Sequence, residues 1–189
     1  MTVQQKAFAD LLLDSPIIAA VKDDEGMERA LSSDCQVIFV LYGTILNIHE
    51  IIDRAKQQDR LVFIHVDLIE GLSGKEIALD YLKQKTQADG IVSTRIHLIK
   101  YARTIGLFAI QRFFLIDSLS FENVKKQAAY ADAVDILPGI MPKIIRKLTG
   151  QIRKPLIASG LISDKQDMMT ALAAGANAVS GTCSDLWFE

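Results

Sequence analysis

The stretch KPLIASGLISDKQDMMTALAAGANAVSGTCSD, residues 154–185, decides the fold. An apolar strand at 155–158 leads through the turn SGLI into a helix at 163–174, and a second apolar strand at 176–180 ends in the turn GTC. Two successive strand ends rich in Gly, Ser and Thr are typical of the anion-binding corner that follows the last two strands of a (β/α)8 barrel. The alternative is that small residues merely suit tight turns between strand and helix.

Six further apolar runs precede this stretch, and a pattern that predicts a helix follows each of them. They occupy residues 17–21, 37–41, 61–66, 90–93, 107–110 and 133–137. Strands that alternate with helices predict parallel pairing, and continuously apolar strands predict a sheet covered on both faces. A doubly wound open sheet also satisfies this pattern, but eight repeats favour closure.

We therefore expect an α/β fold, a minimal TIM-type (β/α)8 barrel, as a single domain over residues 1–189. A short helix at 3–13 leads into it. Only SDLWFE remains after the eighth strand, so the last helix is expected to be truncated.

The composition limits the classes of function. A net charge of −2 gives no global basic field, so a nucleic-acid partner would need a local patch. The two cysteines lack metal-type spacing, and the first residues resemble neither a signal peptide nor a membrane span. We expect a cytoplasmic protein with no membrane partner, no metal and no cofactor. The oligomeric state stays open, and a homo-oligomer is compatible with the sequence.

Side chains at the carboxyl ends of barrel strands line the functional mouth. The candidates for ligand binding there are Lys22, Asp67, Ser93, Arg95, Arg112, Ser159, Gly160, Gly181 and Thr182. Three cations beside a Gly/Ser/Thr-rich corner suit a small phosphorylated or carboxylated ligand. For each arginine the alternative is a salt bridge with a loop acid.

His65 and Asp67 lie two residues apart on a predicted strand and therefore point to the same face. Two ligands without a third give a weak metal signal, so we expect His65 to be a buried, hydrogen-bonded core residue. Asp67, at the mouth, is the better candidate for accepting hydrogen bonds from ligand hydroxyls; the alternative is that it caps the following loop.

Basic residues gather late in the chain. Lys143, Arg146 and Lys147 share one face of a predicted helix, Arg153 and Lys154 follow, and no acid occurs from 137 to 162. These five residues are a candidate contact for an RNA backbone. The alternative is a solvated helix face whose cations suit the helix carboxyl end.

Several motifs together resemble the glycerol uptake operon antiterminator regulatory proteins. They are HVDLIEG (65–71), STR (93–95), IQRFFLIDS (110–118), ILPG (136–139), ASGLIS (158–163) and SDLW (184–187). The resemblance extends from about residue 17 to 187 and supports Asp67, Arg95, Arg112 and the Ser159–Gly160 turn as mouth residues. Lys22 stands where the resemblance leads us to expect Arg, which keeps the charge but loses the bidentate fork.

The resemblance implies a regulatory barrel that binds glycerol 3-phosphate and acts on the leader mRNA of a glycerol-utilisation operon, so that transcription passes a terminator. The rival hypothesis is an enzyme of the isomerase, epimerase or aldolase type that acts on a small phosphosugar, since the same fold hosts many of these. Lys22, His65 and Asp67 are the residues such an enzyme would have to use. A third hypothesis is a protein-interaction scaffold that binds no phosphate ester.

Overall fold

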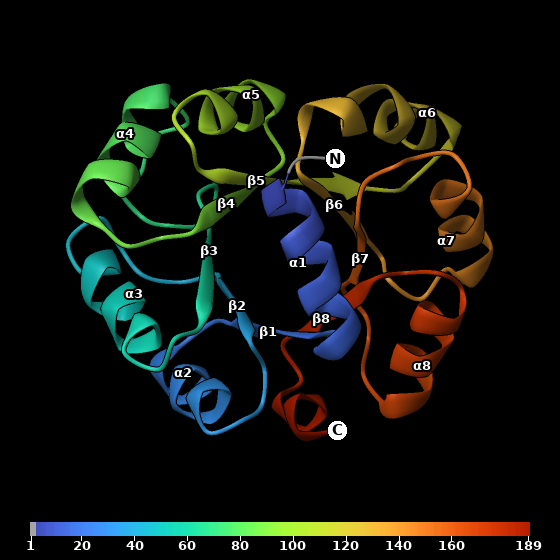
Figure 1. Cartoon of the computed structure of the whole chain (residues 1–189), viewed down its shortest axis with the longest axis horizontal. Helices are drawn as coiled ribbons and strands as arrows, with labels where there is room; N and C mark the ends of the chain where they lie inside the picture. The colour runs from blue at the N-terminus through green and yellow to red at the C-terminus, as the bar shows by residue number, and fades with distance from the viewer. Residues whose placement is uncertain (1–2) are drawn as a thin grey trace.

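Eight parallel strands close into a barrel in the computed structural model, which describes residues 3–189 (Figure 1). Each strand pairs with the next along the chain, and β1 also pairs with β8. The strands are β1 (Ile17–Val21), β2 (Val37–Val40), β3 (Leu61–His65), β4 (Gly90–Ser93), β5 (Phe108–Phe114), β6 (Ala133–Leu137), β7 (Leu156–Ser159) and β8 (Ala178–Gly181). The predicted TIM-type barrel is confirmed.

Helices form an outer ring around the strands (Figure 1). They are α2 (Asp24–Leu31), α3 (Ile48–Lys56), α4 (Glu76–Lys85), α5 (Ile96–Thr104), α6 (Ser118–Gln127), α7 (Pro142–Thr149) and α8 (Lys165–Ala173). A short 3-10 helix, η1 (Ala128–Tyr130), extends α6. The last helix is reduced to a second 3-10 segment, η2 (Ser184–Phe188), as the short remainder of the chain predicts.

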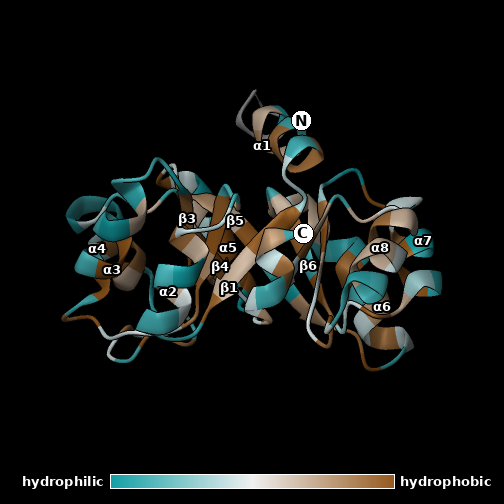
Figure 2. Ribbon diagram, turned by 90° about the horizontal axis from the view of Figure 1, so that it is seen from below, coloured by the Kyte–Doolittle hydropathy of each residue, from teal (hydrophilic) through white to brown (hydrophobic). Residues whose placement is uncertain are grey.

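The first helix, α1 (Val3–Asp14), lies outside this ring and covers one end of the barrel (Figures 1 and 2). Phe8 and Leu12 are buried there with the side chains that fill the barrel. The Phe8 ring lies 5.4 Å from that of Phe63 and 4.7 Å from that of Phe108, centroid to centroid. The strand amino ends are therefore closed by an aromatic cluster, and the opposite end forms the mouth.

Side chains alternate between the barrel interior and the helix layer. On β1, Ile18 and Ala20 pack inside while Ala19 and Val21 pack against the helices. The same alternation places Phe63, Ile110 and Ile157 inside. It therefore fixes which polar residues nearer the carboxyl ends face the interior.

One strand differs clearly from its prediction. The expected strand 107–110 runs from Phe108 to Phe114, because β5 continues to pair with β6 as far as Phe114 and Leu137. Gln111 and Arg112 thus lie within the strand and not in the loop after it.

None of the helices within residues 3–189 has the length and apolar character that crossing a bilayer requires.

Candidate functional site at the barrel mouth

A layer of polar side chains lies above the apolar filling of the barrel. Its members are His65, Arg112, Asp135, Ser159 and Ser180, each two residues beyond an interior apolar side chain of its strand. All five are buried, and Asp135 is fully so. We call this layer the polar floor of the mouth.

A buried ion pair crosses the polar floor. Arg112 and Asp135 are partners in the β5–β6 register, and Arg112 Nε donates to Asp135 Oδ2 at 2.6 Å. The two Nη groups of Arg112 donate no hydrogen bond within residues 3–189. Arg112 is thus held by one edge of its guanidinium, and its Nη groups stay available to a ligand.

Asp135 is not among the site residues that the sequence predicts. Its signal was a single acid inside the apolar run AVDIL, and a buried charge of this kind needs a partner. The expected salt bridge of Arg112 therefore exists, but its acid comes from the neighbouring strand and not from a loop.

His65 is buried beside this pair, as predicted. Its Nδ1 has no hydrogen-bond partner among the described residues, which departs from the expected fully bonded core histidine. Burial, and then the positive charge of Arg112, lower the pKa of His65 to about 4. The ring is therefore neutral near pH 7.

Two further floor atoms also lack partners within the described part of the chain. They are Asp135 Oδ1 and Ser159 Oγ. Buried polar atoms are usually hydrogen-bonded, so unpaired atoms grouped under an open mouth suit a polar ligand or ordered water.

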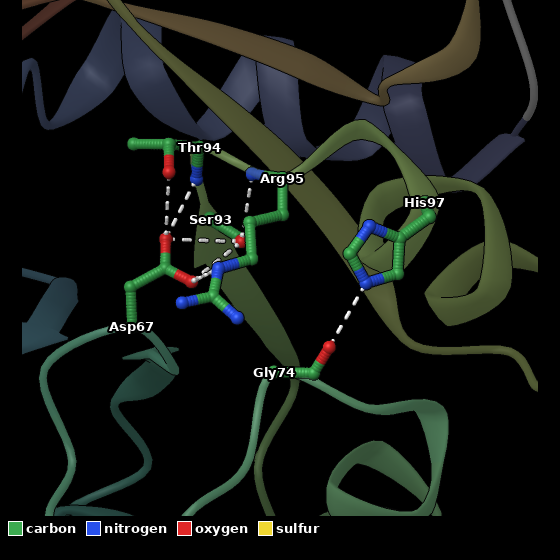
Figure 3. A network of polar contacts seen from close by, with 6 residues as sticks. All are labelled: Asp67, Gly74, Ser93, Thr94, Arg95 and His97. Atoms are coloured by element: carbon green, nitrogen blue, oxygen red, sulfur yellow. Dashed lines mark hydrogen bonds and ion pairs between the residues drawn. The ribbon is translucent and has the colours of Figure 1, made fainter.

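Asp67 is the centre of a hydrogen-bond network on one side of the rim (Figure 3). Its carboxylate accepts hydrogen bonds from Ser93 Oγ at 3.1 Å and from Thr94 through both N–H (2.8 Å) and Oγ1 (3.1 Å). Arg95 Nε lies 3.4 Å from its Oδ1. Asp67 thus ties the end of β3 to the loop after β4, and Ser93, which is fully buried, also accepts from Arg95 N–H at 3.1 Å.

The guanidinium of Arg95 lies against the loop before α4. A Cβ added at Gly74 would stand 1.4 Å from Arg95 Nη1, so the observed position of Arg95 requires glycine there. His97 Nε2 lies 2.9 Å from the Gly74 carbonyl oxygen and holds the same loop (Figure 3).

The two glycine-containing turns lie side by side on the other side of the rim. Ser159 and Ser180 are partners in the parallel β7–β8 register, so the turns that begin after them leave the barrel at the same end. Gly160 and Leu161 both have positive φ, +74° and +60°. Within the described part of the chain, neither the Gly160 nor the Thr182 N–H donates a hydrogen bond.

Neighbouring segments hold both turns. Gly139 N–H donates to the Gly160 carbonyl at 2.9 Å, and Trp187 Nε1 donates to the Gly181 carbonyl at 3.0 Å. Lys22, at the end of β1, is exposed and shares a hollow of about 230 Å³ with Thr182.

The predicted mouth residues therefore gather at one end of the barrel, on two sides of the polar floor. Asp67, Ser93 and Arg95 form one side, and the two turns with Lys22 form the other. Residues 3–189 bring no three His, Cys, Asp or Glu side chains into an arrangement suited to a metal ion.

The basic residues lie on the outer surface, on α7 and the connection after it. Lys143, Arg146 and Lys147 are exposed on α7, opposite the buried Ile145 and Leu148. Arg153 is exposed and Lys154 half-buried in the connection to β7.

The proteins similar to this chain include one sequence relative and two solved structures. The uncharacterized protein YgcP of Escherichia coli is 47% identical over 179 residues, which cover 94% of each chain. The glycerol uptake operon antiterminator regulatory protein of Listeria monocytogenes superposes with a TM-score of 0.84 at 32% identity, over 90% of this chain and 94% of that one. A glycerol uptake operon antiterminator-related protein of Thermotoga maritima gives a TM-score of 0.80 at 30% identity, over 92% and 98%.

More distant barrels share the fold alone, among them an aldolase with a TM-score of 0.72 at 12% identity. The family described as glycerol-3-phosphate responsive antiterminator matches residues 17–187, which is nearly the whole barrel. With this match and the two antiterminator structures, the chain belongs to the glycerol-3-phosphate responsive antiterminator family.

Proposed function

We propose that this protein binds glycerol 3-phosphate in the barrel mouth and, in response, acts on the leader mRNA of a glycerol-utilisation operon so that transcription passes a terminator. Membership of the antiterminator family is the observation that carries this proposal. A protein that acts on a nascent bacterial transcript works in the cytoplasm.

The phosphate group would bind at the paired turns. The N–H groups of Gly160 and Thr182 have no acceptor among the described residues, and Gly160 has the positive φ that anion-binding turns commonly use. Ser159 and Gly181 complete the turns, and Lys22 adds a cation beside Thr182. A phosphate there would gain hydrogen bonds and charge compensation together.

The glycerol part would lie over the polar floor. The Nη groups of Arg112 and the unpartnered Ser159 Oγ offer hydrogen bonds to hydroxyl groups. Asp67, Ser93 and Arg95 would contribute from the opposite rim. Because Asp67 already accepts from Ser93 and Thr94, its main role in the proposal is to orient Arg95 and the loop.

The response to ligand requires different affinities for two arrangements of the protein. Glycerol 3-phosphate can shift the equilibrium only by the difference between its binding free energies to the two states. The loop at Pro138–Gly139 is a candidate for the part that moves, since Gly139 is hydrogen-bonded to Gly160 and α7 follows directly.

A thermal-shift titration with glycerol 3-phosphate, glycerol and inorganic phosphate tests the ligand. At one hundred times Kd, binding to the folded state adds about 2.7 kcal/mol. For a chain of this size that raises Tm by about 5–10 °C. We expect the full shift with the phosphate ester alone, and equal shifts with all three compounds would overturn the proposed ligand.

Matched variants then test the site. Lys22→Gln and Arg112→Met are expected to weaken the glycerol 3-phosphate response at least about tenfold, the loss typical of one charged contact. Lys85→Gln on the outside of α4 is the control and should respond like the wild type. Leader-RNA retention with and without the ligand tests the regulatory step, and equal retention in both conditions would remove the proposed gating.

We further propose that the barrel regulates and does not catalyse. A general base should have a pKa near the working pH, whereas that of His65 is lowered to about 4. Asp67, the other candidate, is already hydrogen-bonded to two residues. Turnover of a triose or pentose phosphate that is lost on Asp67→Ala would instead support the phosphosugar enzyme.

A further inference from the structure

The charge of this protein is divided unevenly around the barrel. Residues 96–154, which form α5, α6, α7 and the segments between them, contain ten Lys and Arg against four Asp and Glu. This part has a net charge of +6, whereas the whole chain has −2, so the remaining residues sum to −8. The buried Arg112–Asp135 pair contributes one charge of each sign and leaves the surface excess unchanged.

Both parts contain paired cations. Arg54 contacts Asp24 and Glu28 in the acidic part, and Arg103 and Lys125 contact Asp132 and Glu122 in the basic part. The basic part differs because its four acids cannot pair with all of its ten cations. Five exposed cations of α6, α7 and the connection after α7 form no ion pair within residues 3–189; they are Lys126, Lys143, Arg146, Lys147 and Arg153. This surface therefore offers uncompensated positive charge.

Aromatic side chains accompany these cations. Tyr130, at the end of η1, is 44% exposed, and Lys100 Nζ lies 4.1 Å from its ring centroid. Arg103 Nη1 donates to the carbonyl oxygens of Ala129 and Tyr130 at 3.3 and 3.2 Å.

A groove lies between α6 and α7. It has a volume of about 420 Å³, and its lining combines the apolar Phe121 and Ile144 with Lys147 and with two acids, Asp117 and Glu122. Single-stranded RNA is recognised by basic grooves that follow the backbone and by aromatic side chains on which unstacked bases lie. The unpaired cations together with an exposed aromatic ring match this ligand better than they match a purely solvated helix face, and the groove adds apolar surface but no net positive charge.

We propose that the outer surface of α6, η1 and α7, which we call the basic face, is where the protein binds single-stranded leader RNA. The basic face is defined by Lys126, Tyr130, Lys143, Arg146, Lys147 and Arg153. The inference rests on the proposed action on RNA, and adds to it a surface separate from the effector mouth. The basic face is also connected to the effector turns, because α7 follows the loop in which Gly139 N–H donates to the Gly160 carbonyl oxygen.

The test measures how much leader RNA the protein retains on a filter, over a series of salt concentrations and with saturating glycerol 3-phosphate. The RNA is transcribed from the glycerol-utilisation operon of the same organism. The basic-face variant is the double substitution Lys143→Gln and Lys147→Gln. The control is Lys83→Gln with Lys85→Gln, two exposed lysines near the end of α4 in the acidic part. Gln keeps helix propensity, and thermal melting verifies that both variants fold.

The basic-face variant is expected to bind at least about tenfold more weakly near 0.1 M salt. Its slope of log K against log salt should be smaller by about 1.4, because each single-strand phosphate that a lysine no longer neutralises reduces the slope by about 0.7. The control variant should reproduce the wild-type affinity and slope. Tyr130→Ala should weaken binding with little change in slope, because stacking is not ionic.

Failure of the proposed function and failure of the basic face would give different results. If wild-type protein retains no leader RNA in either ligand state, the proposed function is wrong and this inference loses its basis. If wild-type protein binds while the basic-face variant keeps its affinity and slope, the basic face is wrong and the proposed function stands. If the variant keeps RNA binding but loses antitermination in transcription, the surface serves a protein partner, which also overturns the inference.

Discussion

Replacing Asp135 by Asn removes one charge from a pair that the barrel buries almost completely. Asp135 is 0% exposed and Arg112 8%, and their only hydrogen bond to each other joins Nε to Oδ2 at 2.6 Å. Removing one partner of a buried ion pair leaves the other charge unsolvated and typically costs about 3–5 kcal/mol. A folded domain is stable by about 5–15 kcal/mol, so Asp135→Asn should remove a large fraction of the total.

Replacing Arg112 in place of Asp135 should lower the free energy of unfolding by a similar amount. Arg112→Met leaves the Asp135 carboxylate buried, with Oδ1 already lacking a partner among the described residues. The double variant, Arg112→Met with Asp135→Asn, removes both charges. We expect it to cost much less than the sum of the single variants, because the desolvation of both charges is avoided.

The assay is urea unfolding followed by both circular dichroism and Trp187 fluorescence, whose coincidence checks two-state behaviour. Single variants that each lose less than about 1 kcal/mol, or a double variant that loses the sum, would refute the buried-pair argument. The double variant also separates stability from function: it should fold, yet need at least about tenfold more glycerol 3-phosphate for the same thermal shift, since the Arg112 donors are gone.

Three further outcomes follow from other parts of the barrel. The pKa of His65 lies near 4 when folded and near 6.5 when unfolded, so protonation favours the unfolded chain, and up to about 3 kcal/mol of stability is lost as pH falls from 6.5 to 4. His65→Gln should lack this drop in urea unfolding. Gly139→Ala should lower the free energy of unfolding by about 1–3 kcal/mol, because the added Cβ would stand 2.9 Å from Ser159 N. Gly150→Ala is the control, since its Cβ would lie 3.7 Å from the nearest atom and should not lower stability. Equal Tm values for the two variants would contradict this reasoning. Phe8→Ala should cost about 3–5 kcal/mol by opening the aromatic cluster, while Leu13→Ala, 71% exposed on the same helix, should be nearly neutral by the same measurement.

The repeat pattern was sufficient to predict the architecture. Eight continuously apolar runs separated by helical patterns predicted a closed parallel barrel, and the strands lie within one or two residues of their predicted bounds apart from the far end of β5. That end was missed because Gln111 and Arg112 look like the polar end of a strand. Gln111 instead bonds Gln127 on α6, and Arg112 turns inward to Asp135.

The mouth residues were predictable as a set but not in their partnerships. Asp67 was expected at the mouth, and its position at the end of β3 agrees. Its bonds to Ser93, Thr94 and Arg95 connect residues 26 to 28 positions apart, and no local pattern reports such contacts. The uncompensated cations around α6 and α7 were visible only in part, because Lys126 and Tyr130 are distant in sequence from Lys143.

The sequence by itself determined the order of strands and helices and the two glycine-containing turns, since side-chain alternation and turn chemistry act over a few residues. Tertiary structure alone decided that Arg112 meets Asp135 and that α1 closes the far end. It also decided that Gly160 and Thr182 follow neighbouring strands, with N–H groups that have no acceptor among the described residues. The physical reason is closure of the barrel: it brings strands from both ends of the chain into register, and only then do distant charges and backbone groups acquire their neighbours.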